Sequence, residues 1–188
     1  MRANGPLSGI TILEFAGIGP GPFAGMLLAD LGADVILIER PARAGDPLDL
    51  GKNAILNRGK RAICLDFKNP RAVDLVLELA NTCDALIEGM RPGVMERLGL
   101  GPDVLLARRP ALVYGRMTGW GQSGPLAQRA GHDINYIARS GALWYSGQAG
   151  TAPLAPPTLV GDLGGGALYL ALGLVAGVLH ARATGEGQ

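Results

Sequence analysis

Two short segments each combine an acid/base side chain with glycines at the start of a stretch with helical character. Residues 131–136 contain His132, and residues 159–166 contain Asp162. Histidine has an unperturbed pKa near ~6.5, so its imidazole can accept or donate a proton at neutral pH. A carboxylate at a helix start is held by backbone N–H groups while its outer oxygen stays free. If the two groups lay on opposite faces of one carbon atom, one could remove a proton from its face and the other could return a proton on the opposite face. This is the chemistry of a racemase.

Each of these side chains also has an ordinary structural explanation. A lone histidine at a helix start is more often a simple polar residue than a catalyst, and Asp162 could be only a helix cap. The three consecutive glycines 164–166 favour the functional interpretation, because each costs a helix about 1 kcal/mol relative to alanine. We therefore expect a ligand carbonyl to approach the N–H groups at this helix start, where they could also stabilise an enolate oxyanion.

The composition predicts one globular domain. The chain has 188 residues and 48% hydrophobic residues, so disorder is excluded despite thirty glycines and thirteen prolines. Seventeen Lys and Arg against sixteen Asp and Glu give a net charge of +1, which offers no electrostatic case for nucleic acid or an anionic membrane as a partner. The uncharged run 163–180 contains five glycines and is at the edge of membrane-spanning length, and we expect a buried helix instead.

The two cysteines, Cys64 and Cys83, both lie in apolar stretches, and the N-terminus does not resemble a signal peptide. We expect two buried thiols in a reducing compartment rather than a disulfide or a metal pair. This interpretation places the protein in the cytoplasm.

Strand-like and helix-like segments alternate through the first 116 residues. The expected strands are 10–15, 34–39, 62–67, 84–88 and 111–115, and the expected helices are 23–30, 70–83, 94–98 and 102–108. This order predicts an α/β fold with an open, doubly wound, mostly parallel sheet. A long loop is expected over 41–60, and after Trp120 we expect a helix over 132–144, a proline-rich loop over 152–157 and the long apolar helix.

The glycine-rich loop 17–22 after the first expected strand superficially matches a dinucleotide-binding motif, with Glu39 where a ribose-binding acid would stand. Pro22 occupies the third glycine position, and neither Pro20 nor Pro22 can donate an N–H group to a pyrophosphate. A structural turn that lets another chain or a ligand approach closely is the better interpretation.

Four basic residues each fall just after the carboxyl end of an expected strand: Arg40, Lys68, Arg91 and Arg116. Ligands of open parallel sheets bind along this edge. Basic residues are common in surface loops, so any one of them alone means little. Together they predict a site for the phosphates of a large anionic ligand, which arginine can bind through two parallel hydrogen bonds.

The chain resembles the α-methylacyl-CoA racemase branch of the family III CoA-transferase superfamily. The resemblance is carried by segments 14–22, 28–35, 39–41, 91–99 and 117–122, together with the two motifs around His132 and Asp162. His132 in the Gly-His-Asp-Ile-Asn-Tyr motif indicates the racemase branch, because the transferases carry other residues there.

The resemblance implies a reaction and a set of site residues. His132 and Asp162 would be the two acid/base residues that invert C2 of a 2-methyl-branched acyl-CoA thioester through an enolate. No metal or redox cofactor is implied, because CoA is part of the substrate. The residues implied to line the CoA site are Arg40, Leu65, Asp66, Phe67, Lys68, Gly89, Met90, Arg91, Arg97, Gly131, Asp133, Ile134, Asn135 and Tyr136.

The resemblance also implies an interlocked homodimer in which the partner's small domain closes each active site. Family members are about twice as long, so residues 1–188 would be the CoA-binding large domain, an N-terminal fragment without the small domain. Two alternatives stay open. Asp162 could be a covalent nucleophile in CoA transfer between acids, or the chain could be a non-catalytic CoA-binding module or an inactive remnant.

Overall fold

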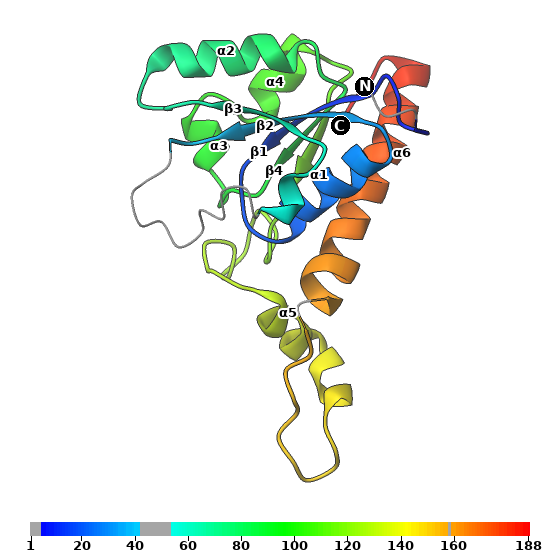
Figure 1. Ribbon diagram of the computed structural model, residues 1–188. Helices are drawn as coiled ribbons and strands as arrows, with labels where there is room; N and C mark the ends of the chain where they lie inside the picture. Colours follow the sequence, from blue (N-terminus) through cyan, green and yellow to red (C-terminus); the bar gives the residue numbers. More distant parts are fainter. Residues whose placement is uncertain (1–4, 42–53, 158) are drawn as a thin grey trace.

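The centre of the molecule is an open sheet of five parallel strands (Figure 1). The computed structural model describes residues 5–41, 54–157 and 159–188. The strands are β1 (Thr11–Phe15), β2 (Asp34–Glu39), β3 (Arg61–Cys64), β4 (Ala85–Glu88) and β5 (Val113–Arg116). Their order in the sheet is β3-β2-β1-β4-β5, and every neighbouring pair is parallel. The predicted α/β class and parallel sheet are confirmed.

Helices cover both faces of the sheet, as the strand and helix alternation predicted (Figure 1). One face packs against α1 (Pro20–Asp30) and α6 (Leu168–Thr184), and the other against α2 (Pro70–Ala80), α3 (Val94–Arg97) and α4 (Pro102–Arg108). Consecutive strand residues point to opposite faces. Ile12 therefore lies in the core below α1 and α6, and Leu13 lies in the core below the other three helices.

Short helical elements complete the described chain. A 3-10 turn, η2 (Ile55–Asn57), precedes β3, while residues 42–53 of the expected loop lie outside the described residues. The helix expected over 132–144 is instead α5 (Asp133–Ser140) followed by a 3-10 turn, η3 (Ala142–Ser146), because Gly141 adopts a left-handed conformation (φ +84°) that ends α5. A π-helix, η4 (Val160–Ala167), runs directly into α6.

Two glycines let α6 pack closely on β5. A Cβ atom added at Gly177 would lie 2.7 Å from Val113 Cγ1, and one added at Gly115 would lie 2.9 Å from Leu170 Cδ1. Among the described residues, the helix is covered on this side, as expected of a buried helix, and exposed on the opposite side. Its exposed apolar side chains are Leu168, Tyr169, Leu172 and Leu179.

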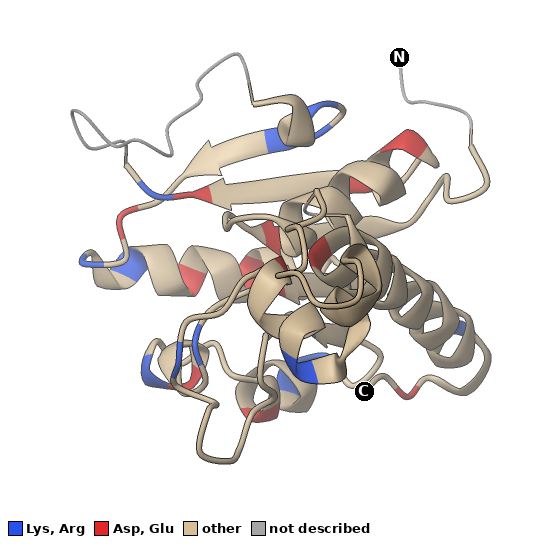
Figure 2. Cartoon of the chain, turned by 90° about the horizontal axis from the view of Figure 1, so that it is seen from below, with Lys and Arg blue, Asp and Glu red and all other residues tan. Residues whose placement is uncertain are grey.

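The helical stretch Val160–Thr184 is the one stretch of the described residues that is long and apolar enough to cross a membrane. Its mean hydropathy is 1.7 and 28% of the window is buried. Arg182 is the single charged Lys, Arg, Asp or Glu residue of α6, and Figure 2 shows the rest of its ribbon uncharged. A core helix of a soluble protein can pass the same test, so the finding is weak support for a membrane span.

The two outer edges of the sheet differ in how they are covered, and this explains one further difference from expectation. The N–H group of Tyr114 donates to the Gln188 carbonyl (2.7 Å), and the Gly187 N–H donates to the Pro110 carbonyl (2.6 Å), so residues 187–188 cover the free edge of β5. At the opposite edge, β3 exposes Cys64, whereas Cys83 is buried, and both thiols are free. The prediction that Cys64 is buried was wrong because the edge position of β3 leaves it uncovered.

Candidate active site

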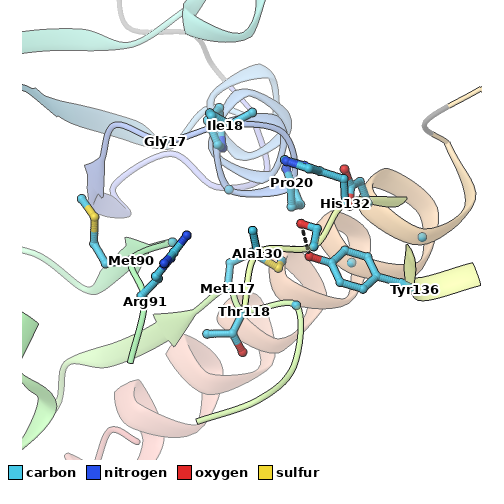
Figure 3. Close-up of a pocket in the computed structure, with 18 of the residues that line it drawn as sticks. Gly17, Ile18, Pro20, Met90, Arg91, Met117, Thr118, Ala130, His132 and Tyr136 are labelled. Atoms are coloured by element: carbon cyan, nitrogen blue, oxygen red, sulfur yellow. Dashed lines mark hydrogen bonds between the residues drawn. The ribbon is translucent and has the colours of Figure 1, made fainter. Parts of the chain in front are cut away.

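A cavity of about 540 Å³ opens at the carboxyl edge of the sheet (Figure 3). The segments that follow β1, β4 and β5 form three of its sides, and residues from 127–136 and 161–166 complete it. This is the edge where open parallel sheets bind ligands. Both predicted acid/base residues, His132 and Asp162, line this one cavity.

His132 stands at the N-cap position of α5 with an extended backbone (φ −137°, ψ 175°). Its N–H group donates to Asn135 Oδ1 at 2.9 Å, so the side chain of Asn135 caps the helix. The His132 side chain is exposed and lines the cavity. An exposed imidazole in this place is accessible to a ligand and to a proton on that ligand.

Asp162 lies in the first turn of η4 and only 6% of its surface is exposed. It faces the glycine-rich loop after β1, where a Cβ atom added at Gly19 would lie 3.6 Å from Asp162 Oδ2. Gly19 has a φ of +70°, a conformation that side-chain-bearing residues rarely adopt. Burial raises the pKa of the Asp162 carboxyl, the charge of Asp133 raises it further, and His132 lowers it. The two acid/base groups are thus close enough to influence each other.

Asp133 is a structural anchor rather than part of the cavity wall. Its Oδ2 atom accepts hydrogen bonds of 2.7 Å from the N–H groups of both Gly161 and Asp162, and only 4% of the residue is exposed. The carboxylate of Asp133 thus faces the helix start rather than the cavity, and its place in the CoA site stays a prediction. Asp133 ties the first turn of α5 to the first turn of η4 and holds Asp162 at its backbone.

The glycines 164–166 are explained largely by the π-helix itself. A Cβ atom added at Gly164 would lie 2.8 Å from the Leu159 carbonyl oxygen, and one at Gly165 would lie 2.8 Å from the Val160 carbonyl oxygen. The Gly164 N–H donates to Leu159 (2.7 Å). The space expected for a ligand carbonyl at Gly164 is therefore filled by the chain's own backbone. Gly165 and Gly166 do line the cavity.

An aromatic pair supports the wall beside His132. The rings of Trp120 and Tyr136 meet edge to face, with centroids 4.9 Å apart, and the Tyr136 hydroxyl donates to the Gly131 carbonyl. A Cβ atom at Gly131 would lie 2.7 Å from Tyr136 Cε1 and 2.8 Å from Trp120 Nε1, so only glycine fits there. The pair fixes the segment that leads into His132.

Five of the fourteen residues predicted to line the CoA site line the cavity, and nine do not. Those that line the cavity beside His132 and Asp162 are Gly89, Met90, Arg91, Gly131 and Tyr136. Those that do not line it are Arg40, Leu65, Asp66, Phe67, Lys68, Arg97, Asp133, Ile134 and Asn135.

The outlying residues have identifiable surroundings. Leu65 and Asp66 line a separate open hollow of about 610 Å³ against α2, together with Asn69 and Glu78. Phe67 stacks on Phe15 with ring centroids 6.1 Å apart, so its ring belongs to the core. Arg40 and Lys68 are exposed after β2 and β3, at the carboxyl edge of the sheet. A ligand that occupied only the cavity would not contact these residues.

Arg116 differs from the other three basic residues at this edge. Its Nε donates to Glu88 Oε1 (3.0 Å) and its Nη2 lies 2.8 Å from Glu96 Oε1. Two carboxylates thus already balance the charge of its guanidinium, which makes Arg116 a weaker candidate for phosphate than Arg91. Arg91 does line the cavity, and Figure 3 shows its side chain there beside Met90.

Sequence reasoning missed several lining residues after β5. Met117, Thr118 and Gly119 follow that strand directly and form one side of the cavity. The strand-end rule applied to Arg116 would have found them, since it holds for every residue type in such a loop. Segment 17–22 was interpreted from sequence as a turn that permits close approach. It comprises the loop after β1 and the first residues of α1, and it supplies the opposite side with Gly17, Ile18, Pro20, Gly21 and Pro22.

Comparison with known proteins places this site in a family. Human α-methylacyl-CoA racemase is 44% identical over 97% of this chain and 46% of its own length, and human succinyl-CoA:glutarate CoA-transferase is 36% identical over 97% of this chain and 43% of its own length. A crystal structure of a CAIB/BAIF family protein from Brucella suis superposes with a TM-score of 0.87 at 33% identity, covering 99% of this chain and 52% of that one. This chain thus spans about half the length of the relatives it matches. Because residues 7–188 match the sequence profile described as CoA-transferase family III, the chain belongs to that family.

Proposed function

We propose that the cavity binds an acyl-CoA thioester and that His132 and Asp162 exchange the proton on C2, which inverts a 2-methyl-branched acyl chain. The observation that carries this proposal is the presence of both groups in one cavity, His132 at the start of α5 and Asp162 in the first turn of η4. The 44% identity to human α-methylacyl-CoA racemase supports the same reaction.

The electrostatics of the pair fit a two-base proton exchange. The raised pKa of Asp162 keeps its carboxyl protonated at higher pH than an ordinary aspartate. In one direction neutral His132 takes the α-proton and protonated Asp162 delivers a proton to the other face of the enolate. In the reverse direction the aspartate takes the proton and the imidazolium returns one. The thioester makes this step accessible because it acidifies the α-hydrogen.

The family resemblance extends the proposal to the whole protein. Residues 1–188 form the CoA-binding large domain, and a second domain closes the site within a homodimer. The reaction uses no metal or redox cofactor, because CoA enters as part of the substrate. The protein acts in the cytoplasm without nucleic acid or membrane partners, and the net charge of +1 is consistent with this.

CoA transfer is a second candidate, supported by the 36% identity to human succinyl-CoA:glutarate CoA-transferase and by the carboxylate of Asp162 in the cavity. Asp162 would attack the thioester carbonyl, form a mixed anhydride and release CoA thiolate. The thiolate would then attack the aspartyl carbonyl, giving an aspartyl-CoA thioester and the free acid. An acceptor acid would reverse these steps and leave with CoA.

Two parallel incubations distinguish the two reactions. In both, the protein is given a single epimer of a 2-methylacyl-CoA. The first also contains a second carboxylic acid, and the second instead receives hydroxylamine, beside an enzyme-free control because hydroxylamine also cleaves free thioesters. We expect loss of optical purity at C2, no CoA on the second acid and no hydroxylamine-sensitive enzyme. Stoichiometric transfer with trapping at Asp162 would replace racemisation by CoA transfer. If neither reaction occurred while CoA still bound, the chain would be a non-catalytic CoA-binding module.

A further inference from the structure

The guanidinium of Arg116 lies between two carboxylates beside the cavity, and the proposed chemistry does not use it. Glu88 and Arg116 stand opposite each other in register as the last residues of β4 and β5. Arg116 Nε donates to Glu88 Oε1 at 3.0 Å, and Nη2 pairs with Glu96 Oε1 at 2.8 Å. Its side chain is 19% exposed, so both contacts are partly shielded from water.

Glu88 connects this guanidinium to the cavity loops. Its side chain is 1% exposed, and its second oxygen, Oε2, accepts a hydrogen bond of 2.7 Å from the Met90 N–H. Its backbone carbonyl accepts the Met117 N–H at 2.8 Å. The starts of the two loops that line the cavity after β4 and β5 are therefore both held by this one buried residue.

Glu96 connects the same guanidinium to the far end of the loop after β4. The loop passes through Arg91 and turns at Gly93, whose φ is +84°, and α3 begins at Val94. Glu96 lies on α3, so Arg116 ties both ends of segment 89–96 to a single point. Arg91 lies between the two tied ends and lines the cavity. Among the described residues, Arg91 has no salt bridge.

We propose that Arg116 is a positioning residue for ligand binding: by pairing with Glu88 and Glu96 it fixes segment 89–96 and directs the Arg91 guanidinium toward an anionic group of the bound thioester. The inference rests on the proposed function insofar as that ligand is a CoA thioester. Arg116 is unsuited to bind the anion itself, because its charge is balanced by two carboxylates. The planar fork of arginine is needed, because a lysine ammonium cannot hold two carboxylates in the same geometry.

Double-mutant cycles test the inference in the whole protein as its host produces it. Calorimetry measures the affinity of each variant for CoA. The variants are Arg91→Gln, Arg116→Lys, Glu96→Gln and the doubles with Arg91→Gln. Arg108→Gln, on the exposed side of α4, is the matched control and should leave CoA affinity unchanged. We expect each single change at positions 91, 96 and 116 to weaken CoA binding about tenfold, the effect of losing a charge-assisted hydrogen bond.

The double variants show whether Arg116 acts through Arg91. If Arg116 acts through Arg91, Arg116→Lys and Glu96→Gln should cause no further loss once Arg91 is glutamine. At saturating substrate the single variants should keep kcat within about twofold while KM rises, because only uniform binding is lost. Additive losses in the doubles, or CoA affinity unaffected by Glu96→Gln, would overturn the inference.

Two other results, unfolding of a variant and failure of the wild type to bind CoA, can be distinguished from a failure of this inference. Should thermal melting show that Arg116→Lys unfolds, the half-exposed Glu96→Gln and its double with Arg91→Gln decide the question alone. A wild-type protein that did not bind CoA would contradict the proposed function and remove this inference with it. A wild-type protein that binds CoA and shows additive losses would contradict only the role of Arg116.

Discussion

The backbone N–H group of Asp162 donates a hydrogen bond of 2.7 Å to the Oδ2 atom of Asp133, the residue next to His132 in the chain. The same oxygen accepts the Gly161 N–H. One buried carboxylate thus joins the helix start that carries the imidazole to the helix start that carries the candidate acid. The relative placement of His132 and Asp162 depends on this contact.

Replacing Asp133 should change the pH dependence of the reaction. Asp133→Asn keeps an oxygen that can accept both N–H groups but removes the charge that raises the pKa of Asp162. The pKa of Asp162 should fall, so the activity that requires protonated Asp162 should be lost at lower pH than in the wild type. A fall of one unit lowers the protonated fraction, and hence the rate above that pKa, about tenfold. The pH profile of α-proton exchange at saturating substrate measures this.

The matched control for that variant is Asp103→Asn, an exposed carboxylate in the first turn of α4. It should leave the profile in place. A profile for Asp133→Asn that coincides with the wild type would show that Asp133 does not influence the titration of the catalytic acid.

The π-helix should tolerate no side chain at Gly164. A Cβ atom there would lie 2.8 Å from the Leu159 carbonyl oxygen, closer than real Cβ atoms approach, so Gly164→Ala should lower the free energy of unfolding by about 1–3 kcal/mol. Gly173→Ala is the control, because this glycine of α6 has open space around its Cβ position. That variant should raise the free energy of unfolding by up to about 1 kcal/mol. Urea unfolding compares the two, and equal effects would contradict the crowding argument.

Replacing one partner of the buried ion pair beneath α1 should destabilise the protein strongly, whereas replacing both partners should destabilise it much less. Lys60 Nζ lies 2.7 Å from Glu14 Oε1 and 3.0 Å from the carbonyl oxygen of Pro22, a residue of the cavity wall. Lys60→Met leaves a buried carboxylate without its cation and should cost about 3–5 kcal/mol of unfolding free energy. Adding Glu14→Gln removes that charge and should recover most of the loss.

The pH dependence of the destabilisation caused by Lys60→Met tests the same ion pair. Burial raises the pKa of Glu14 to about 7 from 4.5. A carboxyl whose pKa is raised by folding is favourable below its unfolded pKa and loses that contribution as pH rises through the folded pKa. Lys60→Met should therefore be less destabilising at pH 4 than at pH 8. Equal destabilisation at both pH values would show that Glu14 does not titrate in this way.

The strands and the carboxyl-edge site follow from local sequence patterns. Buried strand segments, Gly32 at a helix end and Pro70 at a helix start are readable over a few residues, and their alternation implies parallel strands. Parallel strands in turn place Arg91 near one edge, whereas His132 and Asp162 follow the last strand and are held there by contacts between α5 and η4. The exposure of Cys64 could not be predicted in this way, because the edge position of β3 depends on strand order, which local patterns do not encode.

The parts of the site that sequence reasoning missed depend on contacts between distant residues. Arg116 pairs with Glu88 and Glu96, and Asp133 binds backbone groups 28 and 29 residues away. Their inward orientation follows from packing, whereas the sequence shows only charged residues at loop ends. The π-helix at Asp162 was missed for a related reason, since its bonding pattern has no distinctive period in eight residues.

The central claim is that His132 and Asp162 exchange a proton on C2 from two faces, and deuterium incorporation tests it most directly. The naturally expressed protein is incubated in D₂O with one epimer of a 2-methylacyl-CoA, and optical purity and deuterium at C2 are followed by NMR. The account predicts racemisation with deuterium incorporation in the wild type, and a loss of about 10²–10⁴ in rate for both His132→Ala and Asp162→Ala. Near-normal exchange in both variants would contradict it.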